Sequence, residues 1–269
     1  GRANIAFGGN ANSLHVPGRA AFSALEDARR AIARALGATR PDEVVLTSGA
    51  TEADDAAILG LVQAAAEQRR LTGQKDRALH VITSAIEHDA VLAPCRRLEG
   101  EGVLVTYLRP NRQGFIEASS LAEALTDDTV LVSVQAANSE VGAIQPIREL
   151  AALAHERGAL FHTDAVQAVG HVKINVKEMN IDMLSLSAHK FHGPKGVGAF
   201  YCRRGIPLNN LIDGGAQERG KRAGTENVAG IVGLATALRI ADSELEQTAP
   251  RLTAMRDRLI DGILQSVPM

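Results

Sequence analysis

Short runs of consecutive apolar residues recur along this chain, and longer Ala-rich stretches separate them. An apolar run of roughly five residues predicts a strand buried on both faces, whereas apolar positions at a period of about 3.6 residues predict a helix. Their alternation predicts an α/β fold, with a mostly parallel seven-stranded sheet between helices. The predicted strands are Val44–Thr47, Leu79–Thr83, Val103–Tyr107, Val130–Val134, Ala159–Thr163, Met183–Leu186 and Val197–Cys202, and the predicted helices include Phe22–Leu36, Glu52–Gln68, Asp89–Glu99 and Ile147–Arg157.

The last part of the chain has a different pattern. From Thr225 to Leu245, and again from Arg251 to Ser266, the apolar positions keep a helical period and no strand follows. We therefore predict a partial N-terminal segment over residues 1–15, a large domain over 16–245, and the beginning of a smaller C-terminal domain over 246–269. The chain stops inside what resembles the opening of another element, so we expect it to be a piece of a longer protein.

Composition narrows the functional classes. The chain has 269 residues and a net charge of −2, which gives no sign of a polyanion-binding surface. Aromatic residues make up 3% and Trp is absent, which argues against a stacking platform for single-stranded nucleic acid. Because there is no apolar run of about 18 residues, we expect a cytoplasmic protein without a membrane span. The two cysteines, Cys95 and Cys202, fall in a helix and a strand and are expected to be core residues rather than a disulfide.

The segment from Thr47 to Ala53 follows a predicted strand and opens a predicted helix. Gly49 permits close approach of a ligand, and the N–H groups of Ala50 and Thr51 would point out of a helix end that carries about half a positive charge. A phosphate group suits that position. A plain N-cap at Thr51 suits the same residues, so both interpretations stay open here.

Three polar residues follow two other predicted strands, where parallel α/β folds build their sites. His88 could stack on a planar ring or move a proton, although an ordinary loop histidine also fits. Asp164 ends an apolar strand, where a carboxylate needs a cationic partner such as a protonated pyridine nitrogen, or else serves as a helix N-cap. Gln167 could donate to a ring hydroxyl.

Lys190 lies between an apolar strand and a glycine-bracketed turn. A lysine in an apolar pocket near other cations has a lowered pKa, so its free amine can attack an aldehyde. Ser187 and His189 flank it and could reach the same phosphate as Thr51. An exposed loop lysine is the alternative, but four strand ends that each supply what one cofactor needs favour pyridoxal 5'-phosphate held at Lys190 as a Schiff base.

In their order and spacing these segments resemble the cysteine desulfurases of the iron–sulfur cluster assembly type, within the class V aminotransferase family. The resemblance covers about Asn12 to Val232 and is most specific in the run Gln217 to Thr225, which the wider superfamily does not share. It implies the large domain of the pyridoxal-phosphate-dependent fold type I. The segments that carry it are Asn12–His15, Gly18–Arg19, Thr47–Asp54, Glu87–His88, Asp164–Gln167, Ser187–Gly196 and Gly214–Thr225.

The resemblance also implies roles. Lys190 and His88 would be catalytic, with His88 stacked on the ring, Asp164 paired with the ring nitrogen and Gln167 bonded to the ring oxygen. L-cysteine would become alanine, and its sulfur would pass to a protein cysteine as a persulfide and then to an acceptor protein or iron–sulfur scaffold. We expect a homodimer, and no metal, nucleic acid or membrane partner. The residues that the resemblance places around the cofactor are Ala50, Thr51, Asn138, Asp164, Gln167, Ser187, His189, Lys190 and, from the neighbouring subunit, Thr225.

The chain departs from the family's pattern in three places. Asn138-Ser139-Glu140 stands where the family has Asn-Asn-Glu, and Ser139 falls at the asparagine that contacts the ring oxygen. Asp55 stands where asparagine is common. The nucleophilic cysteine and the arginine for the substrate carboxylate have no match in this chain, since neither Cys95 nor Cys202 falls at the required position.

Two alternatives remain open from sequence. One is another lyase or aminotransferase of the same fold, such as a selenocysteine lyase. The other is a partner domain that keeps the fold and has lost turnover.

Overall fold

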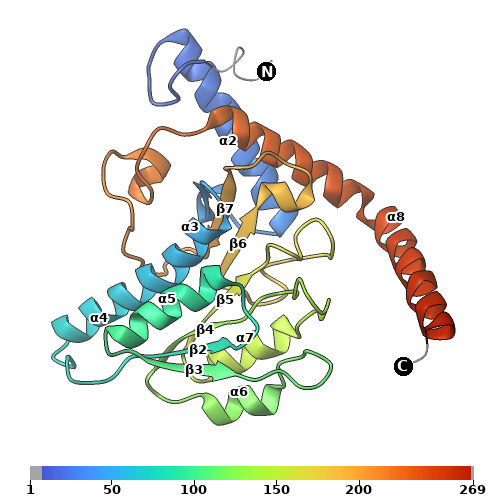
Figure 1. Cartoon of the computed structure of the whole chain (residues 1–269). Helices are drawn as coiled ribbons and strands as arrows, with labels where there is room; N and C mark the ends of the chain where they lie inside the picture. The colour runs from blue at the N-terminus through green and yellow to red at the C-terminus, as the bar shows by residue number, and fades with distance from the viewer. Residues whose placement is uncertain (1–7, 268–269) are drawn as a thin grey trace.

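The computed structural model describes residues 8–267, and the part of the predicted N-terminal segment over residues 1–7 lies outside them. One seven-stranded sheet runs through the molecule in the order β1-β7-β6-β5-β4-β2-β3 (Figure 1). The strands β2 to β6 are parallel, and β7 runs antiparallel to both β6 and β1, which confirms the mostly parallel sheet. The bounds are β1 Val44–Thr47, β2 His80–Ser84, β3 Leu104–Leu108, β4 Thr129–Ser133, β5 Leu160–Asp164, β6 Met183–Ser187 and β7 Gly198–Cys202.

Helices cover both faces of the sheet, and each face has its own apolar core. Leu25, Leu150 and Leu234 pack into one core, whereas Ile58 and Val91 pack into the other. A sheet covered on both faces explains why β1, β2, β6 and β7 are buried at every position. The helices are α2 Val16–Leu36, α3 Ala50–Asp55, α4 Leu61–Leu71, α5 Asp89–Gly100, α6 Ala118–Ala124, α7 Ile147–Glu156 and α8 Val228–Ser266, and short helical segments are η1 Pro41–Glu43, η2 Ala56–Gly60, η3 Ala188–Phe191 and η4 Gln217–Gly220.

The two helices predicted at the end of the chain, over Thr225–Leu245 and Arg251–Ser266, form a single continuous helix. Helix α8 runs unbroken for 39 residues, with Pro250 inside it. A proline inside a helix removes one backbone hydrogen bond and clashes with the preceding turn, which bends a helix without necessarily ending it. Figure 1 shows α8 curving away from the sheet over its second half. The prediction of a break between Leu245 and Arg251 was wrong.

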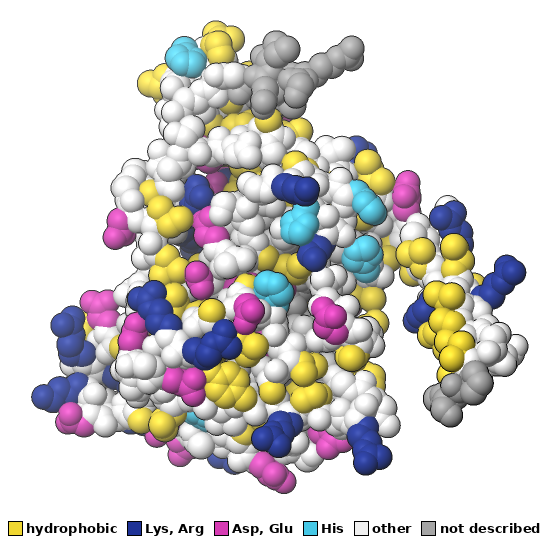
Figure 2. All heavy atoms as spheres, in the orientation of Figure 1, with side chains coloured by type: hydrophobic (Ala, Val, Ile, Leu, Met, Phe, Trp, Pro, Cys, Tyr) yellow, Lys and Arg dark blue, Asp and Glu magenta, His cyan; other side chains and the backbone are white. Residues whose placement is uncertain are grey.

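The second half of α8 carries an apolar stripe that the described residues leave exposed. Leu252 is 49% exposed, Leu259 64% and Ile263 50%, at the spacing of one helix face. Figure 2 shows hydrophobic side chains along the projecting end of the C-terminal helix. The division at residues 245 and 246 remains a proposal, which this stripe supports because a helix face of this kind packs against other polypeptide. Within residues 8–267, no helix combines the length and apolarity that crossing a bilayer requires.

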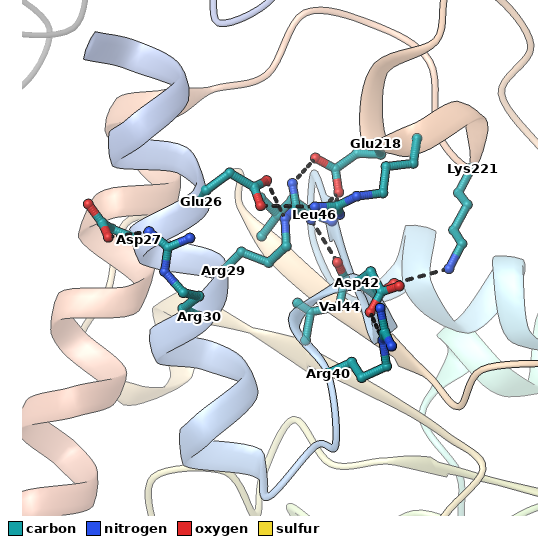
Figure 3. A network of polar contacts seen from close by, with 11 residues as sticks. Glu26, Asp27, Arg29, Arg30, Arg40, Asp42, Val44, Leu46, Glu218 and Lys221 are labelled. Atoms are coloured by element: carbon teal, nitrogen blue, oxygen red, sulfur yellow. Dashed lines mark hydrogen bonds and ion pairs between the residues drawn. The ribbon is translucent and has the colours of Figure 1, made fainter. Parts of the chain in front are cut away.

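A buried ion pair attaches the loop before α8 to the sheet (Figure 3). Arg29 on α2 donates to both carboxylate oxygens of Glu218 on η4, at 2.6 and 2.8 Å, and both side chains are 2% exposed. Arg29 also donates to the carbonyl of Val44, and Glu218 accepts from the N–H of Leu46, so the pair joins α2, β1 and η4. Glu218 has a left-handed φ of 48°, so these bonds hold strained backbone in place.

Removing this carboxylate should destabilise the protein strongly. We expect Glu218→Ala to lower the free energy of unfolding by about 3 kcal/mol, the low end of the range for breaking a buried pair, because Glu26 still accepts from Arg29. Denaturant unfolding measures it. The matched control is Arg219→Ala, whose side chain is 46% exposed and should change the unfolding free energy by no more than about 1 kcal/mol. Equal losses in the two variants would contradict the importance of the buried pair.

Candidate active site

A cavity of about 430 Å³ lies where α3, β5 and η3 meet. Its volume is within the range of small-molecule sites. It brings together eight of the residues that the sequence analysis singled out, from segments up to 140 positions apart. These are Ala50, Thr51, His88, Asp164, Gln167, Ser187, His189 and Lys190.

One end of the cavity is the start of α3. Its N-cap is Gly49, which has no side chain to cap the helix, so the plain Thr51 N-cap is not what the structure shows. The helical backbone continues through η2 and α4 to Leu71, which gives this end a long run of aligned peptide dipoles. Ser187 and His189 line the same cavity. Free N–H groups at the helix start and these donors together suit a phosphate group.

The other charged group is Asp164, the last residue of β5, which is 7% exposed. Its Oδ1 accepts from the N–H of Val166 at 2.9 Å and holds the turn after β5, but no helix begins there, so the helix N-cap alternative was wrong. The pKa of Asp164 is raised by burial, and the Val166 N–H and the nearby positive charge of Lys190 oppose that rise. A buried carboxyl with a raised pKa is ionised more readily when a cation binds beside it, so Asp164 suits a cationic group in the cavity.

His88 lines the cavity as predicted and also caps a helix, which was not predicted. Its Nδ1 accepts from the N–H of Ala90 at 3.1 Å and so caps α5, while the exposed ring lines the cavity. Since Nδ1 is an acceptor, the neutral ring carries its proton on Nε2. The cap uses Nδ1 to fix the ring, so Nε2 stays free to donate or accept a proton.

Lys190 lies on η3, directly after β6, and is half-buried. Its backbone carbonyl pairs with Nε2 of His171 at 3.0 Å. The segment ends at His192, whose φ of 66° is left-handed and turns the chain back toward β7. A tight, bonded turn therefore sets the position of the lysine at the cavity.

Two predicted residues do not line this cavity. Asn138 is buried and uses its side chain locally, since its Nδ2 donates to the carbonyl of Ile86 and its Oδ1 accepts from the N–H groups of Glu140 and Val141. It holds a turn, and Ser139 beside it lines the cavity instead. Thr225 lines a separate recess of about 110 Å³ that shares Ser48 and Gly196 with the cavity. Its contact with a neighbouring subunit stays a prediction.

The sequence profile described as "Aminotransferase class-V" matches residues 5–268. The chain belongs to the class-V aminotransferase family. "Cysteine desulfurase IscS" of Dictyoglomus turgidum is 48% identical over 252 residues, which cover 94% of this chain and 61% of that relative. This class-V aminotransferase chain therefore spans about three fifths of the length of such relatives.

Solved structures of similar proteins share the fold. A "NifS-like protein" superposes with a TM-score of 0.90 at 39% identity, over 98% of this chain and 71% of that one. A structure of "SspA in complex with cysteine" superposes with a TM-score of 0.80 at 41% identity, over 87% of this chain and 65% of that one. These likenesses confirm the predicted class-V fold and its resemblance to cysteine desulfurases.

Three further side chains in the cavity were not predicted there. They are Gln135, Lys195 and Asp54 on α3, whereas Ser139 was already named at the family's asparagine position. Asp54 comes three residues after Thr51, so helical spacing could have placed it near the same site. Within residues 8–267, no group of three His, Cys, Asp or Glu side chains is arranged to hold a metal ion.

Both cysteines of this class-V chain are buried, at 0% and 5% exposure. Burial raises the pKa of Cys95 and that of Cys202 to about 12. Since the thiolate is the reactive form, neither thiol is set up as a nucleophile at neutral pH.

Next to His88, the carboxyl of Glu87 is 6% exposed, and burial raises its pKa to about 8. Its Oε1 accepts from the hydroxyl of Ser84 and the N–H of Gln135, while Oε2 has no partner within residues 8–267. The native state therefore binds a proton that the unfolded state, with a pKa near 4.3, has released above about pH 5.

This raised pKa predicts a stability that falls with pH. Glu87 contributes a slope of at most about 1.4 kcal/mol per pH unit, so the stabilisation is complete below about pH 4 and lost as the pH rises through about 8. We expect Glu87→Gln to lack this slope, so that denaturant unfolding from about pH 5 to about pH 8 favours the variant increasingly over the wild type. A difference between the two proteins that stays constant over this range would show that Glu87 is ionised in the folded protein.

Proposed function

We propose that the complete protein is a pyridoxal-phosphate-dependent cysteine desulfurase that converts L-cysteine to L-alanine and transfers the sulfur as a protein persulfide. One observation carries the proposal: a half-buried lysine and a buried aspartate line a single cavity that also contains the start of a helix. Lys190 and Asp164 are the two groups that a pyridine aldehyde requires, and the helix start suits its phosphate.

The residues present fit this cofactor. The cavity offers N–H groups of Ala50 and Thr51 for a phosphate, a carboxylate for a ring nitrogen, and an amine for an aldehyde, in a volume that suits a ligand of this size. When bound, pyridoxal phosphate supplies an electron sink that stabilises negative charge at the carbon next to the substrate's amino group.

Each side chain of the chain then has a defined task. Lys190 presents its amine to the aldehyde and can later hold or return a proton at the substrate carbon. Asp164 keeps the ring nitrogen protonated, and Gln167 donates to the ring oxygen. His88, fixed by its cap on α5, would stack on the ring, with Nε2 left free to move a proton. Ser187 and His189 complete the phosphate site with the start of α3.

Cysteine is the proposed substrate because the relatives are named cysteine desulfurases and one similar structure is described as a complex with cysteine. The buried Cys95 and Cys202 do not suit the persulfide, so we propose that another cysteine of the complete protein takes the sulfur. From there it would pass to an acceptor protein or iron–sulfur scaffold. We further propose a cytoplasmic homodimer in which Thr225 contacts the phosphate bound by its neighbour.

The assay for this proposal measures alanine and protein-bound sulfur after L-cysteine is added to the complete protein with pyridoxal phosphate. The proposal predicts equal amounts of the two products in a single turnover. Turnover of selenocysteine but not cysteine would replace the proposal with a selenocysteine lyase. Bound cofactor without turnover of either substrate would indicate an inactive partner domain.

A further inference from the structure

A second carboxyl group lies at the floor of the cavity. Asp54 on α3 is 0% exposed yet lines the same cavity as Asp164. Neither of its oxygens has a hydrogen-bond partner within residues 8–267. An ionised carboxylate without donors or a cation is very costly to bury, so its state requires an explanation.

The neighbouring strand does not supply a cation. Oδ1 of Asp54 lies 3.5 Å from Nε2 of His162, which is also fully buried. The His162 ring is already bonded on both sides, with Nδ1 2.8 Å from the hydroxyl of Ser133 and Nε2 3.0 Å from that of Ser185. Burial lowers the pKa of His162 to about 3, so the ring is neutral and leaves any charge on Asp54 unbalanced.

The other groups that face Asp54 are mostly acids. They are Asp164 on β5, Glu87 after β2, and Asp55 on the same helix, and each raises the pKa of Asp54 when it is itself ionised, in addition to burial, which is the largest cause. The Ser185 hydroxyl on β6 is the neighbour that opposes this. No Lys or Arg is among the groups that act on it most strongly.

Asp164 has what Asp54 lacks. It accepts the Val166 N–H, and the positive charge of Lys190 favours its ionised form. Two carboxyl groups that interact in a buried site share a proton, which stays on the one with fewer donors and cations. In this pair that group is Asp54.

We propose that Asp54 is a positioning residue that holds a proton at the floor of the cavity, so that Asp164 alone is ionised there. The inference rests on the proposed cofactor function, because an ionised Asp164 is what a protonated ring nitrogen needs. A second negative charge at Asp54 would raise the proton affinity of Asp164 and weaken that ion pair.

The first test reads the proton directly in the complete protein. An infrared spectrum at neutral pH should contain the carbonyl stretch of a protonated aspartic acid, identified by ¹³C-aspartate labelling, which leaves Glu87 unlabelled. This band should disappear in Asp54→Asn and persist in the control Asp55→Asn. Its absence from the labelled wild type would overturn the proposal, even if Asp54→Asn failed to fold.

The second test uses the cofactor. Asparagine is neutral and nearly isosteric with a protonated aspartic acid, so Asp54→Asn should bind pyridoxal phosphate within about threefold of the wild type, whereas Asp164→Asn should bind it at least about tenfold more weakly. Loss of affinity in a folded Asp54→Asn equal to that in Asp164→Asn would show that Asp54 acts as a charge, which overturns the inference. If the wild type bound no pyridoxal phosphate, the proposed function would fail while the infrared result still reported the state of Asp54.

The third readout is the pH dependence of stability. Because the folded state binds a proton that the unfolded state releases above about pH 4, the folding equilibrium constant of the wild type should fall relative to that of Asp54→Asn, by up to about tenfold per pH unit. A purely structural role for Asp54 would give a ratio independent of pH between about 4 and 7, and that outcome would contradict the proposal.

Discussion

Lys190→Ala should abolish the covalent attachment of pyridoxal phosphate and, with it, the yellow absorption band of the purified protein. Lys190 is half-buried, lines the cavity, and carries a positive charge that favours the ionised form of Asp164. Turnover of cysteine should fall by about 10⁴-fold or more, as when an enzyme loses its covalent nucleophile. Absorption spectra and single-turnover assays of the complete protein measure the two effects.

Lys195 is the matched control for this experiment. It lines the same cavity but is exposed and lies on the other side of the glycine turn. Lys195→Ala should therefore keep the yellow band and most of the activity. If Lys195→Ala lost the band and Lys190→Ala kept it, the covalent bond would be at Lys195 and our assignment to Lys190 would be wrong.

Asp164→Asn has the second largest expected effect. The exchange keeps the shape of the side chain and its bond to the Val166 N–H while removing the charge. The ring nitrogen would lose its ionic partner, so the rate of cysteine turnover should fall by about 10²- to 10³-fold, the range for removing one preorganised electrostatic group. Steady-state assays with saturating cofactor separate this rate effect from weaker binding.

The matched control for the charge is Asp55→Asn, one helix position beyond the cavity floor. Asp55 is half-buried and does not line the cavity. Its exchange should leave the turnover rate within about twofold of the wild type, since substitutions away from such features shift free energies by no more than about 0.5 kcal/mol. Similar rates for Asp164→Asn and the wild type would mean that Asp164 only caps the turn after β5.

The fold could be predicted largely from the sequence because both faces of the sheet are covered. All five positions of β2, β6 and β7 are buried, and adjacent apolar residues such as Val81 and Ile82 therefore mark these strands in the sequence. Helix α6 was not predicted, because only Leu121 of its seven residues is buried and the apolar signal is correspondingly weak. The continuity of α8 through Pro250 was missed because proline is a strong local sign of a helix end.

The site was only partly visible in the sequence. Lys190, Asp164 and His88 follow strands whose carboxyl ends meet at one edge, and that rule located them. Helical spacing could place Asp54 near the site, but not show that it is buried. Its protonation state depends on burial against His162 and Asp164, which lie on a strand distant in sequence. The side chain of Asn138 likewise donates to the carbonyl of Ile86, a residue 52 positions away, and no sequence spacing indicates this contact.

The measurement that tests the account most directly is the site of cofactor attachment. The complete protein is incubated with pyridoxal phosphate, reduced with borohydride to make any lysine linkage permanent, digested and analysed by mass spectrometry. The account predicts one modified peptide, with the pyridoxyl-phosphate group on Lys190. Modification of Lys195 instead, or no modified lysine at all, would contradict it.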